Sequence, residues 1–227
     1  PENWDYFARW VYNGSGIDLG VSVARLRDRQ GVFALPTPEA LQADRIEIQL
    51  SHLPYYHLAQ TGALPLDRWL LKWEVAMTYD EPLNIGVLSG VLPEIERGRM
   101  HRLTPMVSLA YSGLTDHTLG IEFQRPILLS TLTDALYPVE MAILSGRLVG
   151  TYLRERLRLV VVVTSFGMDK NYGQLVRAES AYEVQDGLKI SLAYVHFRPP
   201  SAGELGPLSG MNEHDQLLIV GRWDFQR

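Results

Sequence analysis

The stretch "RWLLKWEVAMTYD", residues 68–80, alternates bulky apolar side chains with mostly polar ones. The apolar series is Trp69, Leu71, Trp73, Val75, Met77 and Tyr79, and the positions between include Arg68, Lys72, Glu74, Thr78 and Asp80. A period of two is typical of a β-strand with one apolar and one polar face. The stretch therefore predicts a strand over residues 67–79, which is long against the usual length of about five or six residues.

The same alternation recurs along the chain and predicts eleven strands. They cover residues 4–12, 17–27, 44–58, 67–79, 102–112, 117–126, 141–153, 157–167, 174–185, 188–197 and 215–226. Pro54 lies inside the third strand and is expected to interrupt its ladder or mark a bulge. The seventh strand is the least regular. The pattern as a whole predicts an all-β fold.

The links between these strands differ in length. Tight turns are predicted at residues 13–16, 113–116, 154–156 and 185–187. Longer links cover 28–43, 80–101, 127–140 and 198–214, and links of intermediate length cover 59–66 and 168–173. Short and long links largely alternate, so an up-and-down meander would place the short turns at one end and the long loops at the other.

Composition excludes several classes of protein. Charged residues make up 21% of the 227 residues and the net charge is -5, which leaves no basic footprint for nucleic acid. The absence of cysteine excludes disulfides, thiolate zinc sites and cysteine nucleophiles. The longest apolar run, near residues 157–166, is shorter than the roughly 18 residues that a membrane-spanning helix needs.

The chain resembles the bacterial outer-membrane β-barrels. The resemblance rests on the amphipathic strands, the loop asymmetry, the lack of cysteine, and a last strand that ends in "RWDF", residues 222–225. That ending is similar to the aromatic-ended closing strand of the family, although Gln226 and Arg227 follow Phe225. The resemblance implies an antiparallel up-and-down transmembrane β-barrel in the outer membrane of a Gram-negative bacterium, with both termini periplasmic and the membrane lipid as a partner.

The strand count adds a further expectation. Bacterial barrels normally have an even number of strands, whereas eleven are visible in this sequence. Either one strand within the sequence escapes this pattern or at least one lies upstream of Pro1, and we expect about twelve strands in all. We expect residues 1–227 to belong to a single barrel domain.

Alternation along barrel strands directs one set of side chains into the lumen and the other into the lipid. The residues predicted to line the pore are Arg45, Glu47, Arg68, Lys72, Glu74, Glu122, Arg158, Arg177, Glu179, Glu183, Lys189, Arg222 and Asp224. Those predicted to face the lipid are Trp69, Leu71, Trp73, Val75, Leu159, Val161, Ile190, Leu192, Ile219, Trp223 and Phe225. Among the former, Arg177, Glu179 and Glu183 face the hairpin partner that carries Lys189, which predicts ion pairs there.

Three functions fit these patterns. The first is a channel or transport barrel that passes small polar or amphipathic molecules through a charged lumen. The second is an outer-membrane lipase or deacylase, for which Ser108 and His117 on one hairpin are the candidate pair, and the third is a structural or partner-docking barrel without an open pore. A soluble ligand-binding barrel of lipocalin type is a further alternative. We predict no enzyme, no catalytic or metal-binding residue and no cofactor, and the sequence identifies no periplasmic or membrane partner subunit.

Overall fold

The structure is a computed structural model that describes residues 4–29, 31–34, 49–89, 92–130, 140–168, 172–201, 206–211 and 214–224. These residues form strands and turns without a helix. The strands are β1 (Tyr6–Asn13), β2 (Asp18–Arg27), β3 (Val32–Ala34), β4 (Gln49–Ser51), β5 (Pro54–Leu66), β6 (Trp69–Ser89), β7 (Leu92–Leu114), β8 (His117–Gln124), β9 (Ile127–Leu128), β10 (Ile143–Tyr152), β11 (Leu157–Phe166), β12 (Gln174–Gln185), β13 (Leu188–Arg198) and β14 (Gln216–Trp223).

The strands form an antiparallel meander. Twelve belong to one sheet, in the order β1-β2-β5-β6-β7-β8-β10-β11-β12-β13-β14, with β9 paired to β7. The short strands β3 and β4 form a separate ladder. The all-β antiparallel prediction is confirmed, and each predicted strand has a counterpart on the path from β1 to β14. In the described residues β1 and β14 are each paired on one side only, so closure into a barrel stays a prediction.

Two of the predicted links are strands instead. Residues 59–66 belong to β5, and the turn that follows is Asp67–Arg68, so Arg68 lies in a turn and not in the predicted strand. Most of the predicted loop 80–101 extends β6 and β7, which are 21 and 23 residues long. Proline and glycine weakened the strand pattern in both stretches, but the ladder tolerates them there. The interruption predicted at Pro54 is confirmed, because β4 ends at Ser51 and β5 begins at Pro54.

The chain groups into two compact units. The first comprises Pro1–Gly62, Glu74–Pro105 and Pro126–Glu140, and the second comprises Ala63–Trp73, Met106–Arg125 and Met141–Arg227. The strands β5, β6 and β7 each contribute residues to both. The single domain expected over residues 1–227 stays a prediction.

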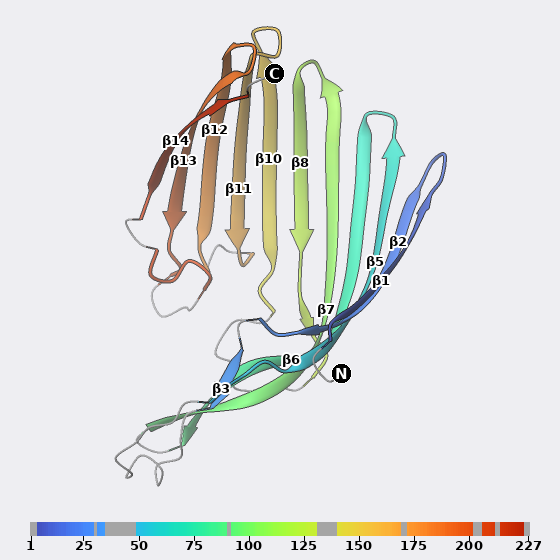
Figure 1. Ribbon diagram of the computed structural model, residues 1–227, viewed down its shortest axis with the longest axis vertical. Helices are drawn as coiled ribbons and strands as arrows, with labels where there is room; N and C mark the ends of the chain where they lie inside the picture. The colour runs from blue at the N-terminus through green and yellow to red at the C-terminus, as the bar shows by residue number, and fades with distance from the viewer. Residues whose placement is uncertain are drawn as a thin grey trace. The chain divides into compact units, whose positions relative to one another are not determined.

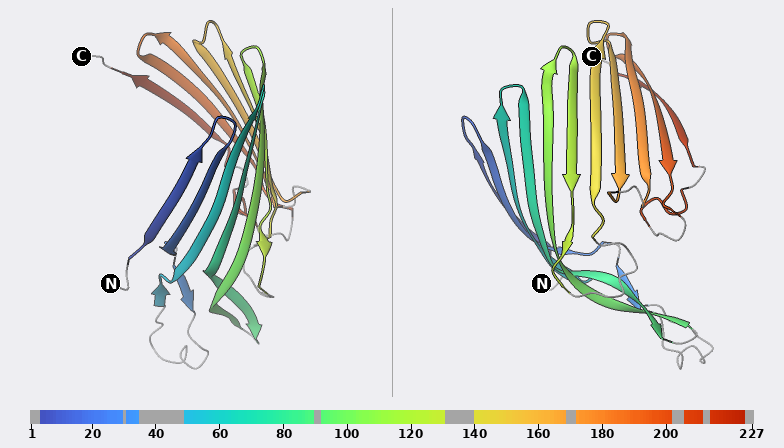
Figure 2. Two further views of the ribbon diagram at one scale, coloured as in Figure 1. Left: turned by 90° about the vertical axis from the view of Figure 1, so that its right-hand side faces the viewer. Right: turned by 180° about the vertical axis from the view of Figure 1, so that it is seen from behind.

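In the second unit β8 and β10–β14 lie side by side in one layer (Figure 1). The turns that join β7 to β8, β10 to β11 and β12 to β13 lie together at the upper end, as the view from behind in Figure 2 also shows. Two of these turns have two residues, Thr115–Asp116 and Asp186–Gly187. Asp116 has a φ of 60° and Gly187 a φ of 81°, left-handed values that aspartate tolerates and glycine adopts freely. The predicted gathering of short turns at one end therefore holds within this unit.

Cross-strand register divides the second unit into two faces. Leu109 pairs with Ile121, Leu148 with Leu119 and with Val161, and Leu192 with Ile219, so these side chains share one face. We call this the apolar face; its apolar members are Val107, Leu109, Tyr111, Leu119, Ile121, Phe123, Leu144, Leu148, Tyr152, Leu157, Leu159, Val161, Val163, Val176, Ala178, Tyr182, Leu188, Ile190, Leu192, Tyr194, Leu217, Ile219 and Trp223. The opposite side is called the polar face.

The first unit contains the β1–β2 hairpin, the β3–β4 ladder and β5 up to Gly62. In the hairpin, Trp10 pairs with Val21 and Tyr12 with Leu19, whereas Arg9 pairs with Ser22 on the other side. The extended parts of β6 and β7 also belong to this unit, where β9 pairs with Arg102 and Leu103.

Few side chains are deeply buried in either unit. No large side chain among the described residues is fully buried, and the buried apolar residues are mainly alanines with Val32, Met100 and Leu208. By contrast, Ile121 is 52% exposed and Leu192 is 44% exposed on the apolar face. Among the described residues, no helix has the length and apolar character required to cross a membrane. The apolar face of the second unit thus remains partly exposed and is not packed into a core.

Candidate functional site

The polar face of the second unit gathers charged side chains from several strands. Each aspartate, glutamate, lysine and arginine within β8 and β10–β14 lies on this face, apart from Arg198 at the last position of β13. The members are Glu122, Arg147, Arg158, Arg177, Glu179, Glu183, Lys189 and Arg222. Seven of them were predicted as pore-lining residues, and the register places those seven on one side.

Charges on the strands β12–β14 are arranged as ion pairs. Arg177 Nη2 lies 2.6 Å from Glu179 Oε2, and Lys189 Nζ lies 3.5 Å from Glu183 Oε2. The Glu183–Lys189 pair crosses the hairpin as predicted, whereas Arg177 and Glu179 pair with each other within β12. Arg222 Nε lies 2.9 Å from Asp224 Oδ1, just after β14. All these side chains are partly exposed, so the pairs neutralise charge locally more than they stabilise the fold.

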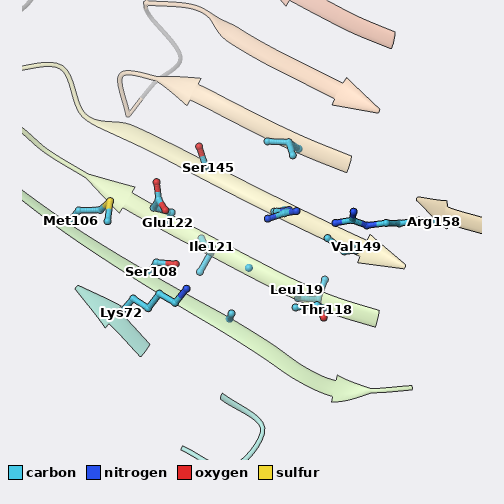
Figure 3. A pocket seen from close by; sticks show the side chains of 14 residues that line it. Lys72, Met106, Ser108, Thr118, Leu119, Ile121, Glu122, Ser145, Val149 and Arg158 are labelled. Carbon is cyan, nitrogen blue, oxygen red and sulfur yellow. The ribbon is translucent and has the colours of Figure 1, made fainter. Parts of the chain in front are cut away.

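A hollow of about 550 Å³ lies on the same face between β6 and β11. Figure 3 shows its lining, with the Lys72 amine directed toward the strand of Ser108 and the Arg158 guanidinium extending toward Val149. Small residues such as Ser108, Gly120 and Ser145 form much of its surface. Glu122 on β8 lies between Ser108 on β7 and Ser145 on β10 in one cross-strand row. The lining residues are Lys72, Met106, Ser108, Ala110, Thr118, Leu119, Gly120, Ile121, Glu122, Ser145, Arg147, Val149, Arg158 and Val162.

Arg147 is the charged member of this site that the sequence pattern missed. It lies on β10, opposite Gly120 on β8 and Val162 on β11. The two glycines near it, Gly146 and Gly150, blur the alternation of the seventh predicted strand. Its face is therefore fixed by its register with the more regular strands on both sides, and that register is a property of the folded sheet.

The remaining predicted pore residues are dispersed. Glu74 lines a hollow of about 220 Å³ in the first unit together with Arg9 and His57. Arg68 Nε lies 3.9 Å from Asp67 Oδ2 in the β5–β6 turn. Arg45 and Glu47 lie outside the described residues.

Of the predicted lipid-facing residues, Leu159, Val161, Ile190, Leu192, Ile219 and Trp223 share the apolar face. Trp69 on β6 packs against Tyr111, with ring centroids 4.5 Å apart. Leu71, Trp73 and Val75 follow it at alternate positions on the same strand. Phe225 lies outside the described residues. Whether these side chains contact lipid stays a prediction.

A second hollow in the first unit, of about 310 Å³, holds a charged pair. Arg102 Nη2 donates to Glu81 Oε1 at 2.7 Å, and Tyr55 and Asn84 also line the cavity. Among the described residues, Glu81 Oε2 and Arg102 Nε are buried without a hydrogen-bond partner. This arrangement could accept one more polar group.

Asp215, just before β14, joins the preceding loop to β13. The Tyr194 hydroxyl donates to its carboxylate at 2.5 Å, and His196 Nδ1 lies 3.0 Å from both carboxylate oxygens. The Phe197 amide donates to Oδ1 at 3.2 Å. These hydrogen bonds, that of Tyr194 first, lower the pKa of Asp215 from 3.8 to about 2.

The residues proposed for hydrolase chemistry do not meet. Ser108 lies opposite Glu122, whereas His117 lies opposite Leu114 and on the other face. The two ring nitrogens of His117 lie 2.7 Å from the Thr115 carbonyl oxygen and 2.9 Å from the Tyr152 hydroxyl. No group of three histidine, aspartate or glutamate side chains in the described part of the chain is arranged to hold a metal ion.

Comparisons of the chain with protein-family models, with curated proteins and with solved structures gave no match.

Proposed function

We propose that this chain forms most of the wall of an outer-membrane β-barrel that passes small polar or amphipathic molecules along its polar face. The observation that carries the proposal is the division of the second unit into two faces. One face has Arg198 as its sole charged residue within β8 and β10–β14, and the other has eight charged residues. In a membrane barrel, hydrocarbon would contact the apolar face and water would contact the polar face.

The exposure of the apolar face supports the membrane as its environment. Burial of apolar area is worth about 25 cal/mol per Å², and Ile121 and Leu192 remain about half exposed in the isolated sheet. Aromatic residues gather at the short-turn end of the strands, where the interfacial girdle of a barrel would lie. They are Trp69, Tyr111, Tyr152, Tyr182 and Trp223.

Backbone pairing supports a closed form. In hydrocarbon, each backbone amide and carbonyl needs a partner, so free sheet edges are not tolerated. An antiparallel path of eleven strands gives β1 and β14 the same direction. One further strand, antiparallel to both, would pair the two edges and give the even number usual in bacterial barrels. A barrel of about twelve strands encloses a lumen between the filled interior of eight strands and the open channel of sixteen.

Conductance in planar lipid bilayers tests the proposal. The purified protein is expected to insert and give discrete conductance steps, with insertion verified independently by protease protection in vesicles. Insertion without conductance would favour the barrel without an open pore. A protein that stays folded and soluble without detergent or lipid would instead support the lipocalin-type alternative and contradict the proposal.

A further inference from the structure

We infer that the solutes of this path are small anions bearing carboxylate or phosphate groups, drawn by Lys72, Arg147 and Arg158 in the hollow between β6 and β11. The inference rests on the proposed function and adds the substrate class to it. Three cations and one carboxylate, Glu122, give the hollow a formal charge of +2. The chain as a whole has a net charge of -5, so this local excess is opposite in sign to the rest of the molecule.

The cations of the hollow differ from those on neighbouring strands. Within the described residues, no acidic oxygen lies within 4.0 Å of the charged nitrogens of Lys72, Arg147 or Arg158. On the same face, Arg177 and Lys189 are each paired with a glutamate. The hollow therefore concentrates positive charges that lack an ion-pair partner on this face, and an entering anion can act as their counterion.

Small side chains keep the three cations accessible. Gly120 lies directly opposite Arg147, and a Cβ added there would come no closer than 4.0 Å to its neighbours. Ser108 and Ser145 lie on either side of Glu122 in one cross-strand row. The floor of the hollow therefore offers hydroxyl groups and space on either side of the Glu122 carboxylate, and its three cations outnumber that single negative charge.

The cations of the hollow come from three strands. Lys72 lies on β6, three strands from Arg147 on β10, and Arg158 is one strand and four residues from the position of Arg147, so the backbone positions are roughly 14 Å apart or more. The Arg158 guanidinium nevertheless extends toward Val149, on the strand of Arg147 (Figure 3). The long side chains therefore bring positive charge into one hollow from separate strands.

Ion selectivity in planar bilayers tests the inference. Reversal potentials in a KCl gradient are compared for the wild-type protein, the triple variant Lys72→Gln, Arg147→Gln, Arg158→Gln, and each single variant. A cation about 7 Å from a passing ion in water changes the anion-to-cation permeability ratio roughly threefold at low salt. The wild type is expected to prefer chloride, and each substitution is expected to lower that preference. The matched control is the double variant Arg177→Gln, Glu179→Gln, which removes a paired charge of each sign and is expected to leave the ratio unchanged.

Binding of pyranine, a soluble trisulfonate dye, to the detergent-solubilised protein provides a second measurement that needs no conductance. The wild-type and control proteins are expected to bind the dye more tightly than the triple variant. Conductance that prefers potassium, or an unchanged ratio in the triple variant, would overturn the inference and leave the channel proposal standing. Absence of conductance would overturn the channel proposal, and equal dye binding by wild type and triple variant would overturn the anion site itself.

Discussion

Arginine at Leu192 should destabilise the protein far more than arginine at the next position, Ser191. Leu192 lies on the apolar face and pairs with Ile219, whereas Ser191 lies on the polar face and pairs with Val220. If the apolar face contacts hydrocarbon, the two substitutions place the same charge in opposite environments. The comparison therefore tests the orientation on which the proposed function depends.

The depth of Leu192 sets the expected magnitude. β13 has 11 residues, and at about 3.3 Å per residue with a tilt of about 40° such a strand crosses about 28 Å of the membrane normal. The apolar band of a barrel is about 25 Å tall, and Leu192 lies near its middle. An arginine facing lipid at that depth costs about 2–4 kcal/mol, which corresponds to a change of roughly a hundredfold in the unfolding equilibrium. Leu188 lies about 10 Å closer than Leu192 to the turn end, measured along the membrane normal. Leu188→Arg should therefore lower the free energy of unfolding by only about 0–1 kcal/mol.

Equilibrium unfolding in phospholipid vesicles, followed by tryptophan fluorescence, measures these differences. Leu192→Arg is expected to lower the free energy of unfolding most, Leu188→Arg little, and Ser191→Arg least. Equal losses at Leu192 and Ser191 would refute the assignment of the two faces. A large loss at Leu192 that persists in lipid-free buffer, with a folded wild type, would show that the apolar face is covered by protein.

Two further predictions concern the turn end and the last loop. Because the folded-state pKa of Asp215 is lowered from 3.8 to about 2, the carboxylate should stabilise the fold fully above pH 3.8, and this effect should be lost as the pH falls toward 2. The difference in melting temperature between wild type and Asp215→Asn should therefore vanish near pH 2. A difference that persists there would contradict the role of the carboxylate. A Cβ at Gly150 would lie 2.8 Å from the Tyr152 hydroxyl, so Gly150→Ala should displace that ring and its hydrogen bond to His117, at a cost of about 1 kcal/mol. Gly120→Ala is the matched control because the space there is open, and equal unfolding free energies for the two alanine variants would count against the packing of Tyr152.

The strands and most turns could be predicted because their signal is local. In β11–β14 the alternation of side chains is regular enough that the sequence bounds differ from the observed ones by a few residues. The Glu183–Lys189 pair across the β12–β13 hairpin followed from the same alternation, since a short turn fixes which residues face each other. These features require only neighbouring segments of the chain.

Features that depend on more distant pairing were missed. β6 and β7 continue through Pro82 and Pro93 and are neighbours in the sheet, whereas local propensity treats proline as a strand breaker. Arg147 joins Lys72 and Arg158 only once β10 is placed between β8 and β11. The hollow is lined by residues from strands that are far apart in sequence, so no short sequence motif predicts it.

The meander also makes the hairpin a natural unit of variation. Consecutive strands in β10–β14 hydrogen-bond only to neighbours along the chain, so a duplicated or deleted hairpin would leave the registers of the others intact. In a closed barrel with strands tilted by about 40°, such an event would change the circumference by about 12 Å and the bore by about 4 Å. Relatives with a wider or narrower barrel could therefore arise by the duplication or deletion of one hairpin, and both chain ends would stay on the same side of the membrane.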